Sequence, residues 1–150
     1  MKVILTHGYF LSEDKAEQQI MMPYPPQGLL HIDTYLQQNK IDCEIIDTTF
    51  SDFQALCSVL ENKKPDIVGL YANLMTRINI LRIVRFIKGN TRLKGTRVIL
   101  GGPDVLHHAE KYLRQGVDYC LAGEGEGPFL ELLEKLEQGN DEKVADIKGV

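Results

Sequence analysis

The chain is predicted to fold as an α/β protein with a doubly wound parallel sheet, and three observations predict it. Short apolar runs alternate with longer segments of helical spacing, and five such strand–helix pairs follow one another. The runs are almost continuously apolar, as in strands covered on both faces. Two of them end in glycine-rich loops, at the strand ends where such sheets meet ligands. We therefore expect five strands in the order 2-1-3-4-5, with helices on both faces.

The first half of the chain contains two strands and two helices. Lys2–Thr6 and Asp42–Asp47 are short, apolar and β-branched, and are expected as strands. The apolar residues of Gln27–Asn39 have helical spacing, and Pro26 suits the start of a helix because its missing N–H would be unpaired there. Helical spacing also predicts a helix behind Ser51, its expected N-cap. That helix contains Phe53, Leu56, Cys57 and Leu60.

The second half repeats the strand–helix unit three times. Its continuous apolar runs are expected as strands at Ile67–Tyr71, Thr96–Leu100 and Val117–Leu121. A segment with helical spacing follows each run. These helices are expected at about Thr76–Lys88, near His108–Gln115 and at about Gly127–Gln138.

Two segments stand outside this alternation. His7–Gln27 has no clear periodicity but is rich in aromatic residues, methionine and proline, so we expect it to cover a ligand or a partner domain. The tail Val144–Val150 is expected as an edge strand or as the start of a linker, after a domain of residues 1–143. The short N-terminal strand leaves no room for a signal peptide, and a cytoplasmic protein is expected.

Composition excludes several classes of function. The net charge of −4 argues against a nucleic-acid-binding face, which would be basic. No apolar stretch approaches the roughly 20 residues of a membrane span. Cys43, Cys57 and Cys120 form no Cys-x-x-Cys pair, so we expect them to pack as small apolar residues rather than to bind zinc or an iron–sulfur cluster.

The candidate ligand site is the set of residues at the carboxyl ends of strands one, three, four and five. Glycines there let a ligand approach the backbone closely. The expected site residues are Thr6, His7, Gly8, Tyr71, Asn73, Leu74, Met75, Thr76, Gly101, Gly102, Pro103, Asp104, Ala122, Gly123, Glu124 and Gly125. Two structural alternatives stay open: a tight turn at Gly101-Gly102, and a helix start at Gly125 whose neighbouring glutamates complement the positive helix end.

Several motifs, taken in order, resemble one known family. They are Pro25-Pro26-Gln27-Gly28-Leu29, Lys64-Pro65-Asp66-Ile67-Val68-Gly69, Val98-Ile99-Leu100-Gly101-Gly102-Pro103, Val117-Asp118-Tyr119-Cys120, Gly123-Glu124-Gly125-Glu126, Phe129-Leu130-Glu131-Leu132-Leu133 and Ile147-Lys148-Gly149-Val150. Together they resemble the N-terminal cobalamin-binding domain of cobalamin-dependent radical S-adenosylmethionine enzymes, of the magnesium-porphyrin monomethyl ester cyclase or methyltransferase type. This resemblance covers essentially the whole chain and implies a Rossmann-like, flavodoxin-like fold.

The resemblance implies that the domain binds cobalamin and presents cobalt to a radical catalytic domain. In the parent enzyme it also implies S-adenosylmethionine and a [4Fe-4S] cluster. The chain contains no Cys-x-x-x-Cys-x-x-Cys motif for such a cluster, so we expect it not to catalyse the parent reaction by itself. Cobalamin domains that ligate cobalt through histidine carry Asp-x-His-x-x-Gly. Here Leu5 replaces the aspartate before His7, so we expect His7 to lack a carboxylate partner and not to ligate cobalt.

Two other classes of function remain open from the sequence. One is an interaction domain that has lost cobalamin and only scaffolds a catalytic partner. The other is a flavodoxin-like binder of flavin or a nucleotide. A phosphate-accepting receiver domain is disfavoured, because Leu5-Thr6 and Tyr71-Ala72 stand where receivers need acidic residues.

Overall fold

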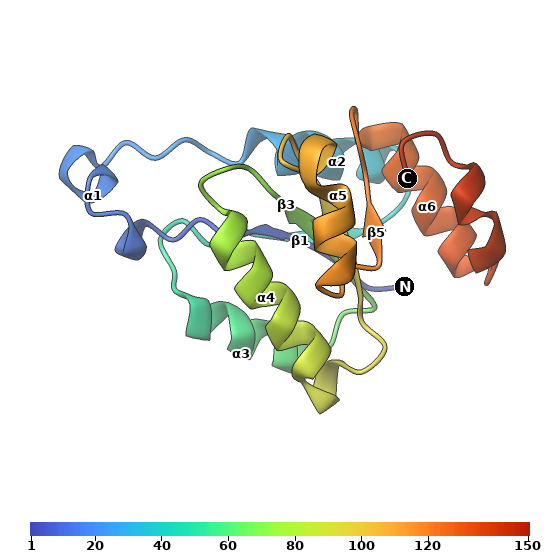
Figure 1. Cartoon of the computed structure of the whole chain (residues 1–150), viewed down its shortest axis with the longest axis horizontal. Coiled ribbons are helices and arrows are strands. Elements are labelled where there is room, and N and C mark those ends of the chain that lie inside the picture. Colours follow the sequence, from blue (N-terminus) through green and yellow to red (C-terminus); the bar gives the residue numbers. More distant parts are fainter.

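A parallel sheet of five strands forms the centre of the molecule (Figure 1). The computed structural model describes residues 1–150, apart from the side chain of residue 141. The strands are β1 (Val3–His7), β2 (Cys43–Ile46), β3 (Ile67–Tyr71), β4 (Arg97–Gly101) and β5 (Tyr119–Cys120). Their order is β2-β1-β3-β4-β5, and every pairing is parallel. The predicted fold class and strand order are therefore confirmed.

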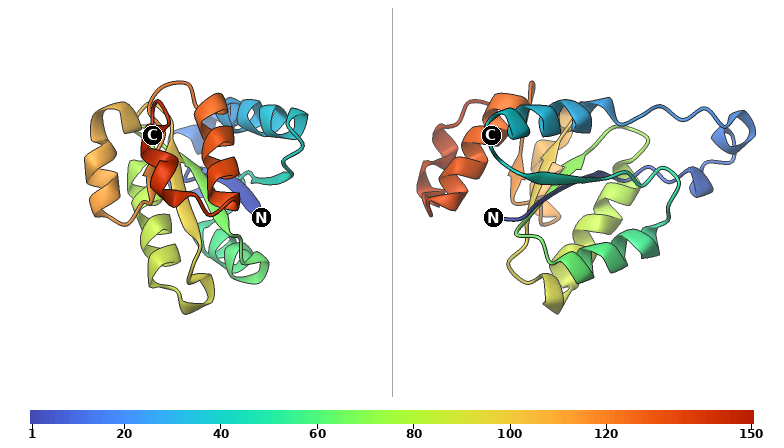
Figure 2. Two further views of the ribbon diagram at one scale, coloured as in Figure 1. Left: turned by 90° about the vertical axis from the view of Figure 1, so that its right-hand side faces the viewer. Right: turned by 180° about the vertical axis from the view of Figure 1, so that it is seen from behind.

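Helices cover both faces of this sheet (Figure 2). The helices are α1 (Glu17–Ile20), α2 (Gln27–Gln38), α3 (Phe53–Lys63), α4 (Arg77–Gly89), α5 (Val105–Arg114) and α6 (Glu126–Glu137). Short 3-10 turns lie at Leu11–Glu13, Thr91–Leu93 and Asp141–Asp146. Helices α3, α4 and α5 pack on one face, and α2 and α6 pack on the other.

The alternation of side chains along each strand produces two separate cores. Val68 and Leu70 of β3 join the α3–α5 side, together with Val98 and Leu100 of β4. Ile67 and Ile99 point the other way, toward α2 and α6. Because side chains of a strand alternate between faces, each apolar run supplies both cores at once.

The main differences from the predicted boundaries concern α5, α3 and β5. Helix α5 begins at Val105 rather than near His108, because Gly102 adopts a φ of +105° and its carbonyl accepts from the Val105 N–H at 3.1 Å. The N-cap of α3 is Asp52, not Ser51; its carboxylate accepts from the Ala55 N–H at 2.8 Å. Strand β5 is shorter than predicted.

The long segment before α2 is partly ordered by packing against the domain. Phe10 and Leu11 are buried, and the Leu11 N–H donates to the Thr49 carbonyl at 2.9 Å. Beyond them, the short helix α1 projects past the end of the sheet (Figure 1). The apolar side chains that follow it, Met22 and Tyr24, are 72% and 92% exposed.

The C-terminal segment 144–150 forms turns rather than an edge strand. Residues Asp141–Asp146 form a 3-10 helix, and Val144 and Ile147 are buried against the α2–α6 core. The Gly149 carbonyl accepts from the Ala122 N–H at 2.7 Å. The other expectation for this tail, a linker, stays a prediction.

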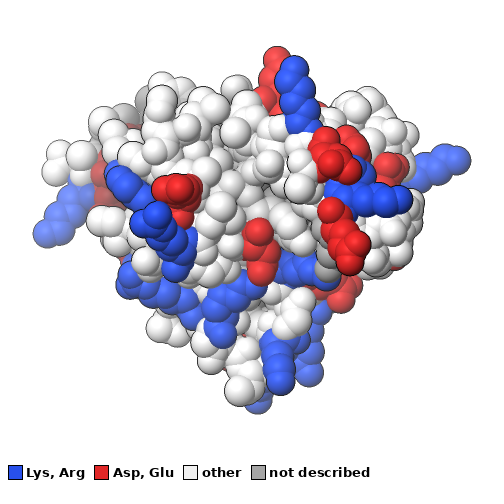
Figure 3. All heavy atoms as spheres, turned by 45° about the vertical axis from the view of Figure 1, so that its right-hand side comes forward, with Lys and Arg blue, Asp and Glu red and all other residues white. Residues whose placement is uncertain are grey.

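Charged side chains are mixed on the face shown in Figure 3, where acidic groups stand among the basic ones. Within the described part of the chain, no helix is both long and apolar enough to cross a membrane. The same residues contain no cluster of histidine, cysteine and carboxylate side chains that could hold a metal ion.

Candidate functional site

A cavity of about 500 Å³ opens between the sheet and the helices α2 and α6. It starts at the carboxyl ends of β3 and β4 and descends along the sheet face. Leu5, Gly69 and Ile99 line it from the sheet, and Leu29 and Phe129 line it from the two helices. We call this space the tail cavity. Its position agrees with the rule that ligands of open α/β sheets bind beyond the carboxyl ends of the strands.

One row of the sheet beside the tail cavity lacks a side chain at its centre. Leu5, Gly69 and Ile99 are neighbours in register across β1, β3 and β4. A Cβ built on Gly69 would lie 2.7 Å from Cδ2 of Leu5 and 3.2 Å from Cζ of Phe129. Glycine inside a strand is unfavourable for the strand itself and marks a close approach by another group. At Gly69 the approaching groups are the side chains of Leu5 and Phe129, which pack directly on the strand.

The double glycine at the end of β4 combines two different requirements. Gly101 has ordinary backbone geometry, and a Cβ built on it would meet nothing within 4 Å. Gly101 lies on the side of β4 that faces the tail cavity. Gly102 has a φ of +105°, and its Cβ would overlap the carbonyl oxygen of Ala72. Gly102 is thus needed for the turn, whereas Gly101 leaves space for a ligand.

The mouth of the tail cavity is more polar than its floor. Glu124 and Glu126 line it from the loop and the first turn of α6. Tyr71 ends β3, and its ring packs on Gly28, where an added Cβ would lie 2.9 Å from Cε2. The glutamates make this mouth unsuited to a free phosphate, because like charges repel.

A second cavity, of about 480 Å³, lies beside the first over the ends of β1 and β3. We call it the rim cavity. It shares Gly28, Leu29 and Tyr71 with the tail cavity, so these residues form the boundary between the two. Its other walls are the 23–27 segment and polar residues that include His7, Thr49, Asn73 and Thr76.

His7 is held by partners on both ring nitrogens. Its Nε2 lies 3.0 Å from Oδ1 of Asp47, and its Nδ1 accepts from the Tyr9 N–H at 3.1 Å. The backbone donor fixes Nδ1 as the acceptor, so Nε2 carries the proton and donates to Asp47. Burial lowers the pKa of His7 below its usual value, although the hydrogen bond and charge of Asp47 raise it. The ring is thus a neutral, fixed group.

The expectation that His7 lacks a carboxylate partner is wrong. Leu5 does replace the expected aspartate on β1, but Asp47 at the end of β2 supplies the carboxylate instead. Asp47 is itself anchored, since it accepts from the Thr49 N–H at 2.9 Å. Nε2 of His7 donates a hydrogen bond to Asp47, and Nδ1 accepts one from the backbone N–H of Tyr9. His7 therefore offers no free lone pair to a metal.

Asp104 has a structural role behind the rim. Its carboxylate accepts from Nε of Arg77 at 2.9 Å and from the buried hydroxyl of Tyr112. The hydrogen bond from Arg77, helped by Tyr112, holds the pKa of Asp104 down at about 2. This ion pair joins the first turns of α4 and α5, and Asp104 lines neither cavity.

The structure divides the predicted site residues between the two cavities and their surroundings. Those in the tail cavity are Gly101, Gly102, Pro103, Gly123, Glu124, Gly125 and Tyr71. Those in the rim cavity are His7, Asn73, Met75, Thr76 and, again, Tyr71. Those that line neither are Thr6, Gly8, Leu74, Asp104 and Ala122. Thr6 is fully buried, and its hydroxyl donates to the Ile46 carbonyl at 2.7 Å.

Sequence reasoning missed the residues that form the body of the tail cavity. They are Leu5, Gly28, Leu29, Ile32, Gly69, Leu70, Ile99, Leu106, Leu121, Glu126 and Phe129. Gly69 carried a usable signal, since it interrupts an otherwise apolar strand. The helical residues carried none, because periodicity identifies a buried face but not which sheet face it covers.

The fold and the site together define a class of protein: a doubly wound domain with a ligand cavity at the carboxyl edge of its sheet. The family model of the B12 binding domain matches residues 19–133. The chain belongs to this family of B12-binding domains, and the resemblance predicted from the sequence is confirmed at that level.

A curated relative is an uncharacterized methyltransferase of Pyrococcus horikoshii, 28% identical over 123 residues. The match covers 79% of this chain but 26% of the relative, so the chain spans about a quarter of that protein's length.

Two solved structures share the fold. The cobalamin-dependent S-adenosylmethionine radical enzyme OxsB matches with a TM-score of 0.74 at 18% identity, over 93% of this chain and 19% of that one. A cobalamin-binding protein of Desulfitobacterium hafniense matches with a TM-score of 0.64 at 17% identity, over 89% of this chain and 58% of that one. At these identities the likeness concerns the fold alone.

The same substitution, to valine, should affect stability differently at the two neighbouring glycines Gly101 and Gly102. Gly101→Val should leave the free energy of unfolding unchanged or raised, because valine suits a strand and meets open space. Gly102→Val should lower it by more than about 1 kcal/mol, because its φ is positive and its Cβ overlaps Ala72. Urea unfolding of the purified variants measures both. Equal losses in the two variants would contradict the separation of roles.

Proposed function

We propose that this domain binds cobalamin with the lower base of the nucleotide tail off cobalt and inside the tail cavity. The observation that carries this proposal is the open space at Gly101, where a side chain is missing beside an apolar slot between the sheet and the helices. The family to which the chain belongs supports the choice of ligand.

The residues present fit the chemistry of such a tail. A flat aromatic base is favoured by apolar walls, and Leu29 and Phe129 supply them at 4% and 2% exposure. The corrin ring would then lie over the rim cavity, held by Tyr71, Asn73 and Thr76. When bound, cobalt supplies the methyl-transfer or radical chemistry, while the protein supplies binding and orientation.

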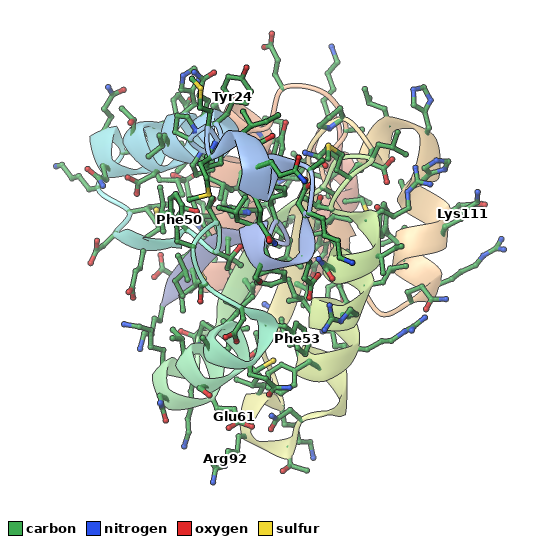
Figure 4. All side chains as sticks on the ribbon, turned by 90° about the vertical axis from the view of Figure 1, so that its left-hand side faces the viewer. Tyr24, Phe50, Phe53, Glu61, Arg92 and Lys111 are labelled. Carbon is green, nitrogen blue, oxygen red and sulfur yellow. The ribbon has the colours of Figure 1, made fainter. Side chains whose placement is uncertain are left out.

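The end of the molecule toward which the strands point is the surface proposed to face a catalytic partner. Tyr24 and Phe50 lie at this end (Figure 4) and are 92% and 76% exposed. Leu74 and Met75 at the start of α4 are 75% and 73% exposed. Large exposed apolar groups gathered at one end of a domain are typical of an interaction surface.

We infer that this partner is a radical S-adenosylmethionine domain with a [4Fe-4S] cluster, in a methyltransferase or a tetrapyrrole cyclase. The support is indirect: the chain resembles the cobalamin domains of such enzymes, shares the fold of part of OxsB and aligns with a quarter of a methyltransferase. Residues 144–150 would lead toward that domain.

Binding of cobalamin should depend on the open space at Gly101. Hydroxocobalamin should bind the wild-type chain and shift its absorbance spectrum, whereas Gly101→Val should weaken binding at least about 100-fold by filling the cavity. Gly89→Val is the matched control, since Gly89 ends α4, lines neither cavity and meets nothing within 4 Å. Isothermal titration measures all three affinities.

The alternatives make different predictions for the same titration. A scaffold domain that has lost the cofactor would not bind cobalamin, and a flavodoxin-like binder would take up flavin instead. Equal affinity of the wild type and a folded Gly101→Val variant would also contradict the proposed site.

Cobalt should receive no nitrogen ligand from His7, because both ring nitrogens are already engaged. Electron paramagnetic resonance of the cobalt(II) form should therefore show no superhyperfine splitting from an axial nitrogen. The spectrum should not change in His7→Ala. Splitting from one nitrogen that disappears in His7→Ala would overturn this assignment.

A further inference from the structure

The chemical character of the tail cavity changes sharply between its floor and its mouth. We propose that this cavity selects cobamides by their lower base, accepting benzimidazole and phenolic bases and discriminating against purines such as adenine. The inference rests on the proposed function and specifies which class of cobamide the same site takes.

Hydrocarbon side chains make the floor and walls of the tail cavity. They are Leu5, Leu29, Ile32, Leu70, Ile99, Pro103, Leu106, Leu121 and Phe129. Leu5, Leu29, Ile99, Leu121 and Phe129 are at most 5% exposed and belong to the core between the sheet and α2 and α6, whereas Leu106 is 56% exposed. None of these side chains can donate or accept a hydrogen bond.

The backbone beside this floor is already paired. Leu5, Gly69 and Ile99 lie in register in the parallel ladder of β1, β3 and β4. The Leu121 N–H donates to the Leu100 carbonyl at 2.8 Å. Peptide groups of these strands are therefore used within the sheet, and a base on the floor meets carbon.

Polar groups of the cavity lie toward its mouth. Tyr71 is two residues beyond Gly69 on β3, which places it roughly 6–7 Å further along the strand. Glu124 and Glu126 come from the loop and helix start that follow β5. These groups are placed to meet the ribose hydroxyl of a tail rather than its phosphate, which the glutamates repel, or a base on the floor.

The lower bases differ in what they would leave unpaired on that floor. Adenine carries an exocyclic amine and additional ring nitrogens, all hydrogen-bonded in water. Dimethylbenzimidazole and cresol present methyl groups and aromatic carbon over most of their outer edge. Burying polar groups without partners is unfavourable, and apolar pockets reject such close analogues by about 10- to 100-fold.

The test compares four corrinoids on the wild-type chain by equilibrium dialysis. They are cobalamin, its p-cresolyl analogue, its adeninyl analogue and cobinamide, which has no base. The p-cresolyl form, whose base has no bond to cobalt to break, should bind at least as tightly as cobalamin, and the adeninyl form at least tenfold more weakly than either. The benzimidazole nitrogen is a stronger base than that of adenine and leaves cobalt less readily. Detaching the base from cobalt therefore costs more free energy in cobalamin than in the adeninyl form. This difference favours binding of the adeninyl form, so it cannot cause the weaker binding that we expect of it.

A pair of variants locates the selectivity in the cavity wall. Leu29→Gln places a hydrogen-bonding group in the cavity and should reduce the ratio of adeninyl to benzimidazolyl dissociation constants several-fold. Leu30→Gln is the control, because Leu30 lies on the same helix, is 43% exposed and does not line the cavity.

Each outcome separates this inference from the function on which it rests. Equal wild-type affinities for the adeninyl and benzimidazolyl forms would overturn the inference and leave cobalamin binding intact. Cobinamide binding as tightly as cobalamin would show that the base makes no contact, which also overturns it. Failure of every corrinoid to bind would overturn the proposed function itself.

Discussion

The missing side chain at Gly101 is the constraint on which the ligand site depends. The strands present closely packed side chains to α3, α4 and α5, where Val68, Leu70 and Leu100 are buried to 2% exposure or less. On the opposite face, two glycines interrupt the same strands: Phe129 of α6 packs on Gly69, and the space beside Gly101 stays open as part of the slot. One sheet thus has a face that stabilises the fold and a face that receives a ligand.

This division has an energetic consequence. Apolar walls that stand open lose the contacts that close packing would give them, so the cavity lowers the stability of the ligand-free domain. A ligand that fills the slot restores those contacts and stabilises the folded state in proportion to the logarithm of its concentration over Kd. The side of the domain that carries α2 and α6 should therefore be the part most stabilised when the cofactor binds.

The extent to which the sequence predicted this molecule follows from the range of its signals. The strands and the glycine rim were predictable, because apolar runs and Gly101-Gly102 are local features. The strand order then followed from the doubly wound class of fold. The partner of His7 was not, since Asp47 lies 40 residues away and meets it only through the pairing of β1 with β2. Asp104 was expected at the ligand site, because the sequence does not show its ion pair with Arg77, which comes from α4.

The most direct test of the account is a crystal structure of this domain with bound cobalamin. The account predicts that the lower base is detached from cobalt and lies in the tail cavity beside Gly101, with His7 still bonded to Asp47. A structure in which the base remains on cobalt, or lies outside the cavity between the sheet and the helices α2 and α6, would contradict it.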